Sequence, residues 1–218
     1  FYPLFSSLDV NAQMHRDAAG RALWEDMVKL GIEARKAIRK RLSGFLDPFV
    51  PDEVEFKGRT VAWEDVPTEV LAREQRYWQL DPKAAWHGYR NLGQDVAMVD
   101  PTKLMLTTPG IDHASGDYQE TGIPATILAN YLRENHIIPE KNDLNSILFL
   151  MTPAEGEGKV AFLLAELERF KALYEADAPL ARVVPGVAAR YAERYADYSL
   201  RQLCDEMHRF YSERNVKE

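Results

Sequence analysis

The chain has 218 residues, enough for one large domain or for a medium domain with an appended helical unit. Hydrophobic residues make up 46% and charged residues 28%, a composition typical of a globular protein and not of a disordered chain. The formal net charge of −7, with acidic and basic residues intermixed, argues against a nucleic-acid partner and against binding to an anionic membrane surface.

Cys204 is the only cysteine, so no intramolecular disulfide can form and we expect a reducing, cytoplasmic environment. No apolar run approaches the length of a membrane span, so no membrane association is expected. The chain opens with the apolar segment Phe1–Phe5, which lacks a preceding basic segment and does not resemble a signal peptide. It starts without methionine and ends in the charged residues 215–218, and we expect both ends to be cuts in a longer protein.

Residues 21–42 are predicted to form an amphipathic helix. Their apolar side chains recur every three or four positions, and the acidic residues precede the basic ones, which suits the helix dipole. Residues 44–60 contain two prolines and two glycines, which predicts a connector with a short hairpin at Lys57-Gly58. Residues 77–100 are rich in aromatic side chains and are predicted to be irregular.

The next predicted elements are a strand and a helix. Lys103–Thr107 reads as a strand that is stopped by Pro109-Gly110. A helix is predicted over Thr121–Glu134, with Pro124 in its first turn and Asn135 as its C-terminal stop.

Two short apolar strands are expected at residues 136–138 and 147–151, the second covered on both faces because it is apolar throughout. Thr152–Glu155 and Ser199–Gln202 match capping boxes, which predict a helix to about Tyr174 and a last helix. The side chains expected to face inward are Val160, Leu163, Leu167 and Phe170 in the first helix and Leu203, Met207 and Phe210 in the second. This order favours an α/β fold of the α+β kind, a two-layer unit with a small, mostly antiparallel sheet behind a long N-terminal helix.

Metal and nucleotide sites are not supported by the residue pattern. Cys204 and His208 are four residues apart on one predicted helix, but no second pair accompanies them, so we expect a small buried thiol beside an ordinary helix histidine. The segment Gly156–Lys159 resembles a phosphate loop faintly, but Pro153 stands where its first glycine is needed and Val160 replaces the required hydroxyl residue.

Two polar residues are candidates for a site. Glu140 lies between Pro139 and Lys141, just after the expected apolar strand, where a rigid edge can present a carboxylate to a cleft. The pattern alone favours a solvated glutamate at a strand end. His87, in an aromatic cluster, is by the same reasoning more typical of a packed, hydrogen-bonded residue than of a catalyst. These residues alone predict an α/β domain and leave its activity open.

Seven strings occur in an order that matches a known enzyme family. They are Phe1-Tyr2-Pro3-Leu4-Phe5, Trp86-His87-Gly88-Tyr89, Thr108-Pro109-Gly110-Ile111-Asp112, Gly122-Ile123-Pro124-Ala125, Ile138-Pro139-Glu140-Lys141, Leu144-Asn145-Ser146-Ile147 and Leu200-Arg201-Gln202-Leu203-Cys204. In this respect the chain resembles the prokaryotic ornithine/lysine/arginine decarboxylases, and most of all their ornithine branch. The resemblance implies a pyridoxal-phosphate (PLP) enzyme of fold type I, a homodimer or higher homo-oligomer with active sites between subunits.

The resemblance also divides the chain. Residues 1–43 would form the end of the large PLP-binding domain and a linking helix, residues 44–155 the small α/β domain, and residues 156–218 its helical remainder. The family's cofactor lysine follows a histidine, and none of the five histidines here precedes a lysine. The Schiff-base lysine is therefore expected upstream, and neither a catalytic residue nor bound PLP is expected in this piece.

Site roles are implied in the same way. Glu140 would receive the distal ammonium of ornithine, which the whole enzyme would convert to putrescine and CO2. Phe1, Tyr2, Trp86 and His87 would lie at the active site or at a subunit interface. Two alternatives stay open: lysine or arginine as the substrate, and a non-catalytic dimerisation or interaction module.

Overall fold

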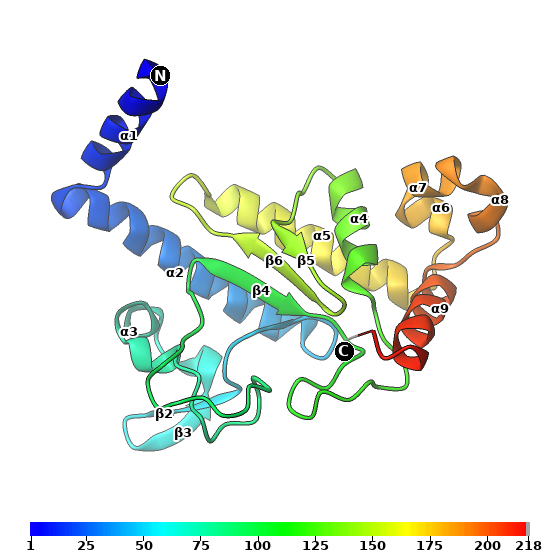
Figure 1. Cartoon of the computed structure of the whole chain (residues 1–218), viewed down its shortest axis with the longest axis horizontal. Coiled ribbons are helices and arrows are strands. Elements are labelled where there is room, and N and C mark those ends of the chain that lie inside the picture. Colours follow the sequence, from blue (N-terminus) through cyan, green and yellow to red (C-terminus); the bar gives the residue numbers. More distant parts are fainter. Residues whose placement is uncertain (217–218) are drawn as a thin grey trace.

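A small antiparallel sheet lies at the centre of the computed structural model, which describes residues 1–216 (Figure 1). Its strands are ordered β1-β4-β6-β5, with the bounds Asp47–Pro48, Lys103–Thr107, Ser146–Leu150 and Lys141–Asn142. A separate hairpin pairs β2 (Glu53–Phe56) with β3 (Arg59–Ala62). The predicted fold class, with a small antiparallel sheet, is confirmed, and β4 has the predicted bounds.

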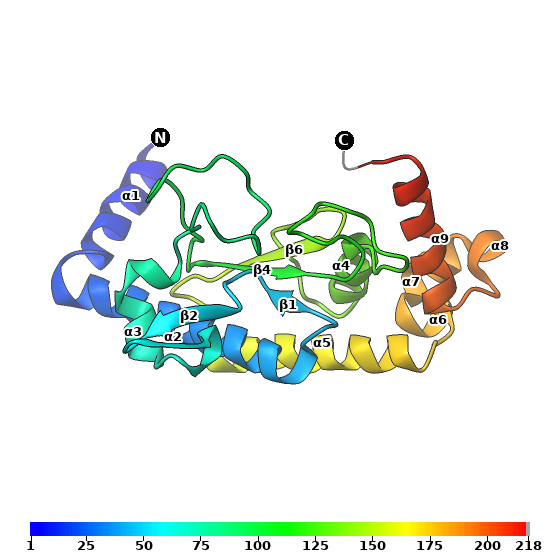
Figure 2. The same cartoon turned by 90° about the horizontal axis from the view of Figure 1, so that it is seen from below.

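Helices cover one face of this sheet. The helices within residues 1–216 are α1 (Tyr2–Met14), α2 (Asp17–Leu42), α3 (Thr68–Arg73), α4 (Ala125–Glu134), α5 (Glu157–Glu175), α6 (Leu180–Val183), α7 (Pro185–Arg190), α8 (Ala192–Tyr195) and α9 (Leu200–Glu213), with 3-10 turns η1 (Trp63–Asp65) and η2 (Gln75–Tyr77). The long helix α2 confirms the predicted one and begins four residues earlier. Helices α2 and α5 run side by side beneath the sheet (Figure 2). Among the helices that the structure describes, none is long and apolar enough to cross a membrane.

The register between β4 and β6 decides which side chains enter the core. Leu104 pairs with Phe149 and Leu106 with Ile147, and all four are buried on the face that the helices cover. The alternate residues point the other way, since side chains alternate along a strand, and Leu150 is 42% exposed. The prediction that this second strand is covered on both faces is therefore wrong, because helices lie on one face only.

A second cluster packs around two indole rings. Trp63 and Trp78 meet edge to face with centroids 5.3 Å apart, and each indole N–H donates to a backbone carbonyl. The buried guanidinium of Arg35 lies over Trp78 and donates to the Lys103 carbonyl at 2.7 Å, and burial lowers its pKa to about 10. Arg35 thus joins α2 to both β4 and the second cluster. The hairpin at Lys57-Gly58 is confirmed, with the positive φ angles that a tight two-residue turn requires.

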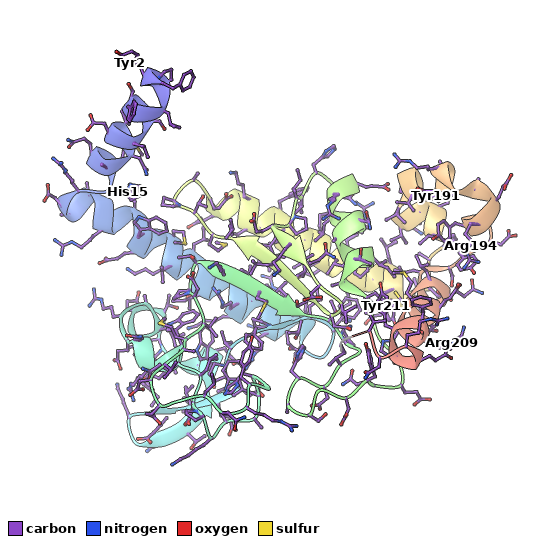
Figure 3. The ribbon with its side chains drawn as sticks, in the orientation of Figure 1. Tyr2, His15, Tyr191, Arg194, Arg209 and Tyr211 are labelled. Atoms are coloured by element: carbon purple, nitrogen blue, oxygen red, sulfur yellow. The ribbon has the colours of Figure 1, made fainter. Side chains whose placement is uncertain are left out.

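Helix α1 projects away from the rest of the molecule, with Tyr2 near its free end and His15 at its elbow with α2 (Figure 3). All its side chains are exposed, including Tyr2 at 87%, and so is Phe1, which precedes the helix, at 88%. The elbow is tight, because a Cβ on Gly20 would lie 2.3 Å from the carbonyl carbon of His15. The first turn of α2 therefore packs directly on the end of α1.

Two sequence predictions around α4 are wrong in part. The helix begins at Ala125 and not at Thr121, because the Ile123 N–H donates to the Pro109 carbonyl and holds that segment extended. The expected strand at 136–138 does not form: the chain turns at His136, which has φ +64°, and the two residues after it are irregular. The N–H of the residue after His136 donates back to α4, and the strand beside β6 is Lys141–Asn142 instead. The predicted stop at Asn135 is confirmed.

The two predicted capping boxes differ in outcome. Ser199 and Gln202 exchange both bonds of the box at the start of α9, as predicted. Thr152–Glu155 instead forms a separate turn, and α5 begins at Glu157 after Gly156. The expected inward side chains of α5 are buried, but Phe210 of α9 is 49% exposed, so its expected burial is wrong.

Asn145, in the loop between β5 and β6, is a buried hub for three segments. Its Nδ2 donates to the carbonyl oxygens of Pro109 at 2.6 Å and Ile123 at 3.3 Å, and to the Thr108 hydroxyl at 3.2 Å. The Thr108 hydroxyl donates in turn to the Ile123 carbonyl at 2.6 Å. Because buried polar groups must be paired, these bonds hold the end of β4 against the start of α4.

We predict that Asn145→Ala lowers the free energy of unfolding by about 1–3 kcal/mol, the usual cost of leaving buried acceptors unpaired. Urea denaturation followed by circular dichroism measures this change. Asn130→Ala is the matched control, because its side-chain amide donates to the Thr126 carbonyl within the same helix and its loss should cost clearly less. Equal effects of the two substitutions would contradict the role of Asn145.

Candidate functional site

Glu140 is held at the edge of the central sheet by its own backbone. Its N–H donates to the Leu148 carbonyl at 2.8 Å, so its position depends on β6. The preceding Pro139 is buried, while the side chain of Glu140 is exposed. The carboxylate is therefore presented from a fixed point of the sheet edge.

The Glu140 cavity, as we call it, has a volume of about 540 Å³ and lies between the segment before β5, the end of β6 and the first turns of α5. Its walls are mostly apolar and include Ile138, Leu150 and Phe162. These three side chains are 82%, 42% and 47% exposed, so the cavity opens onto an apolar surface.

Of the two carboxylates that residues 1–216 place in the Glu140 cavity, that of Glu155 forms an ion pair and that of Glu140 does not. Lys159 Nζ lies 3.2 Å from Glu155 Oε2 and donates to the Ala154 carbonyl at 3.3 Å. Within the part of the chain that the structure describes, the carboxylate of Glu140 has neither a hydrogen bond nor an ion pair. An apolar cavity with an unpaired carboxylate suits a cationic group carried on an aliphatic chain.

Trp86 and His87 lie elsewhere. The ring of Trp86 packs on Phe49, directly after β1, at 5.0 Å between centroids, and β1 is the edge strand opposite β5. His87 is 4% exposed, its Nδ1 accepts from the Tyr89 N–H at 3.0 Å, and its Nε2 lies 2.9 Å from the Asp81 carbonyl. Both ring nitrogens are thus engaged, as expected for a packed histidine, and the structure does not bring these residues together with Glu140.

The neighbouring loop contains a histidine that the sequence analysis passed over. A Cβ on Gly88 would lie 2.0 Å from the carbonyl oxygen of His113, so the loops of these two residues touch. Burial lowers the pKa of His113, which lines a cavity of about 290 Å³ with Asp47, whose pKa burial raises. The signal in the sequence was the position of His113 directly after the string that ends at Asp112.

Cys204 and His208 are both buried in α9. His208 Nε2 lies 2.8 Å from the Gln119 carbonyl, and its ring packs against Gly122, where a Cβ would be 2.4 Å from Nδ1. Burial raises the pKa of the Cys204 thiol from 9.0 to about 12. Among residues 1–216 no group of three or more potential metal-ligating side chains gathers.

We predict that iodoacetamide at pH 8 modifies Cys204 far more slowly in the folded protein than in urea. A pKa higher by three units lowers the thiolate fraction roughly a thousandfold, and the thiolate is the species that reacts. Mass spectrometry measures the rate, with glutathione in the same tube as the internal standard. Similar rates in the folded and unfolded protein would show that the thiol is accessible and ordinary.

Known proteins resemble this chain along its whole length. The family model described as Orn/Lys/Arg decarboxylase, major domain, matches residues 1–159. The constitutive ornithine decarboxylase of Escherichia coli is 53% identical over 100% of this chain, and the lysine decarboxylase LdcA of Pseudomonas aeruginosa is 34% identical over 96%. The crystal structure of the Francisella novicida lysine decarboxylase LdcF superposes with a TM-score of 0.83 at 27% identity over 98% of this chain. The chain covers 30%, 27% and 28% of these three proteins, respectively.

Proposed function

Because the chain belongs to the Orn/Lys/Arg decarboxylase family, we propose that the whole protein is a PLP-dependent decarboxylase that converts ornithine to putrescine and CO2. A comparison of sequence identities supports ornithine as the substrate. The chain is 53% identical to a protein named an ornithine decarboxylase and 34% identical to one named a lysine decarboxylase. The chain spans less than a third of these relatives, so the proposal concerns the protein at its natural length.

The observation that carries the proposal is the unpaired carboxylate of Glu140 at an apolar cavity. The distal ammonium of ornithine loses its hydration on entering such a cavity and needs a charged acceptor. The apolar walls, including Ile138 and Phe162, suit the methylene groups of the substrate. Glu140 would thus bind and orient the end of the substrate that does not react.

The residues of this chain do not fit a PLP Schiff-base site. Among the lysines that the structure describes, none is buried, and no histidine in the sequence precedes a lysine. The proposal therefore places the cofactor lysine in another part of the whole protein. When bound, PLP supplies the electron sink that decarboxylation of an amino acid requires.

The remaining expectations belong to the same proposal. A homodimer or higher homo-oligomer would give the exposed α1, with Phe1 and Tyr2, a surface to pack on. The division at residues 43 and 155 stays a prediction, as does the cytoplasmic location suggested by the lone Cys204. The engaged ring nitrogens of His87 favour a structural role within the whole enzyme.

We predict that the whole protein releases CO2 from ornithine with a kcat/KM about tenfold or more above that for lysine or arginine. A single methylene in a shaped pocket is worth about 1–3 kcal/mol, which sets the scale of discrimination against lysine. Manometric or coupled CO2 assays on all three amino acids measure this ratio. A preference for lysine or arginine, or no turnover of any of the three, would refute the proposed substrate.

We predict that Glu140→Gln lowers kcat/KM for ornithine by about 10- to 100-fold, because a charge-assisted hydrogen bond is worth roughly 1.5–3 kcal/mol. Glu140→Ala should cost more, since it also removes the neutral hydrogen bond. Glu193→Gln is the matched control: Glu193 is an exposed glutamate of α8 that does not line the Glu140 cavity. Unchanged kinetics in both Glu140 variants would remove the assignment.

A further inference from the structure

The ion pair in the Glu140 cavity joins Glu155, in the connection after β6, to Lys159 of α5. Figure 1 shows this connection between β6 and α5. Lys159 is four residues after Glu155, in the first turn of the helix. The side chain of Glu155 is 27% exposed and that of Lys159 is 66% exposed. Both line the cavity together with Glu140, and His136 lies among the lining residues as well.

This ion pair determines how many carboxylates in the cavity are free to bind an ammonium group of a ligand. With Lys159 beside it, the charge of Glu155 is compensated, and its other oxygen lies 3.5 Å from the Thr152 hydroxyl. Among the described residues that line the cavity, this leaves Glu140 as the carboxylate that forms no ion pair. Without Lys159, the same cavity would hold two uncompensated negative charges.

We propose that Lys159 is a specificity residue, which neutralises Glu155 so that the cavity favours the amino-acid substrate over its diamine product. This inference rests on the proposed function of the Glu140 cavity. It concerns a residue to which the family resemblance assigns no role.

The chemistry of the two ligands explains the effect. Ornithine has a distal ammonium at one end and an ammonium with a carboxylate at the other, so its second end carries no net charge. The diamine left after loss of CO2 carries an ammonium at each end. Two free carboxylates would bind both ends of the diamine and would repel the carboxylate of ornithine. A single free carboxylate attracts one ammonium of either ligand, so it gives the diamine no additional binding energy over ornithine. Product inhibition is therefore limited.

The test compares inhibition by 1,4-diaminobutane with KM for ornithine in the whole protein. In Lys159→Met the inhibition constant of the diamine should fall about threefold to fivefold, because an interaction between partly exposed charges changes a binding constant by about this factor. The KM for ornithine should stay constant or rise. The change in the inhibition constant should shrink in high salt, because exposed charges are screened. The double variant Glu155→Gln/Lys159→Met should restore the wild-type inhibition constant, since it removes the added charge.

Lys171→Met is the matched control, because Lys171 pairs with Glu175 at the same spacing on the same helix but does not line the cavity. It should leave the inhibition constant unchanged. An unchanged inhibition constant in Lys159→Met, or no restoration in the double variant, would overturn the inference. Failure of the proposed function is seen separately, as unchanged kinetics in the two Glu140 variants.

Discussion

The pairing of β6 with its two neighbours is the constraint on which the core and the candidate site both depend. On one side, β6 pairs with β4 in a register that places Leu104 beside Phe149 on the helix-covered face. On the other side, the Leu148 carbonyl accepts the N–H of Glu140. Because side chains alternate along a strand, a shift of one residue would turn the buried row outward and move the point from which Glu140 is presented.

Strong periodicity and complete caps made parts of the fold predictable. The long amphipathic pattern identified α2, and the Ser199 box identified the start of α9. Short apolar runs did not suffice: residues 136–138 look like a strand, but the backbone of His136 turns there to end α4. The Thr152 box failed for a related reason, since its local hydrogen bonds close a turn and the helix begins after Gly156.

The candidate site was predictable only in part. Residue types and spacing favoured a solvated Glu140, and its role came from the family resemblance. The Lys159–Glu155 pair could be read from the spacing of four, but its place in the same cavity as Glu140 depends on how β6 and α5 meet. Contacts between distant segments, such as Asn145 with Pro109, leave no trace in local sequence patterns, and neither does the contact of His113 with Gly88.

The central claim is that a carboxylate fixed by the sheet edge receives the remote positive charge of a diamine or its parent amino acid. A crystal structure of the whole protein with 1,4-diaminobutane bound tests it most directly. The account predicts one ammonium nitrogen about 3 Å from a carboxylate oxygen of Glu140. A diamine bound elsewhere, with Glu140 facing bulk water, would contradict it.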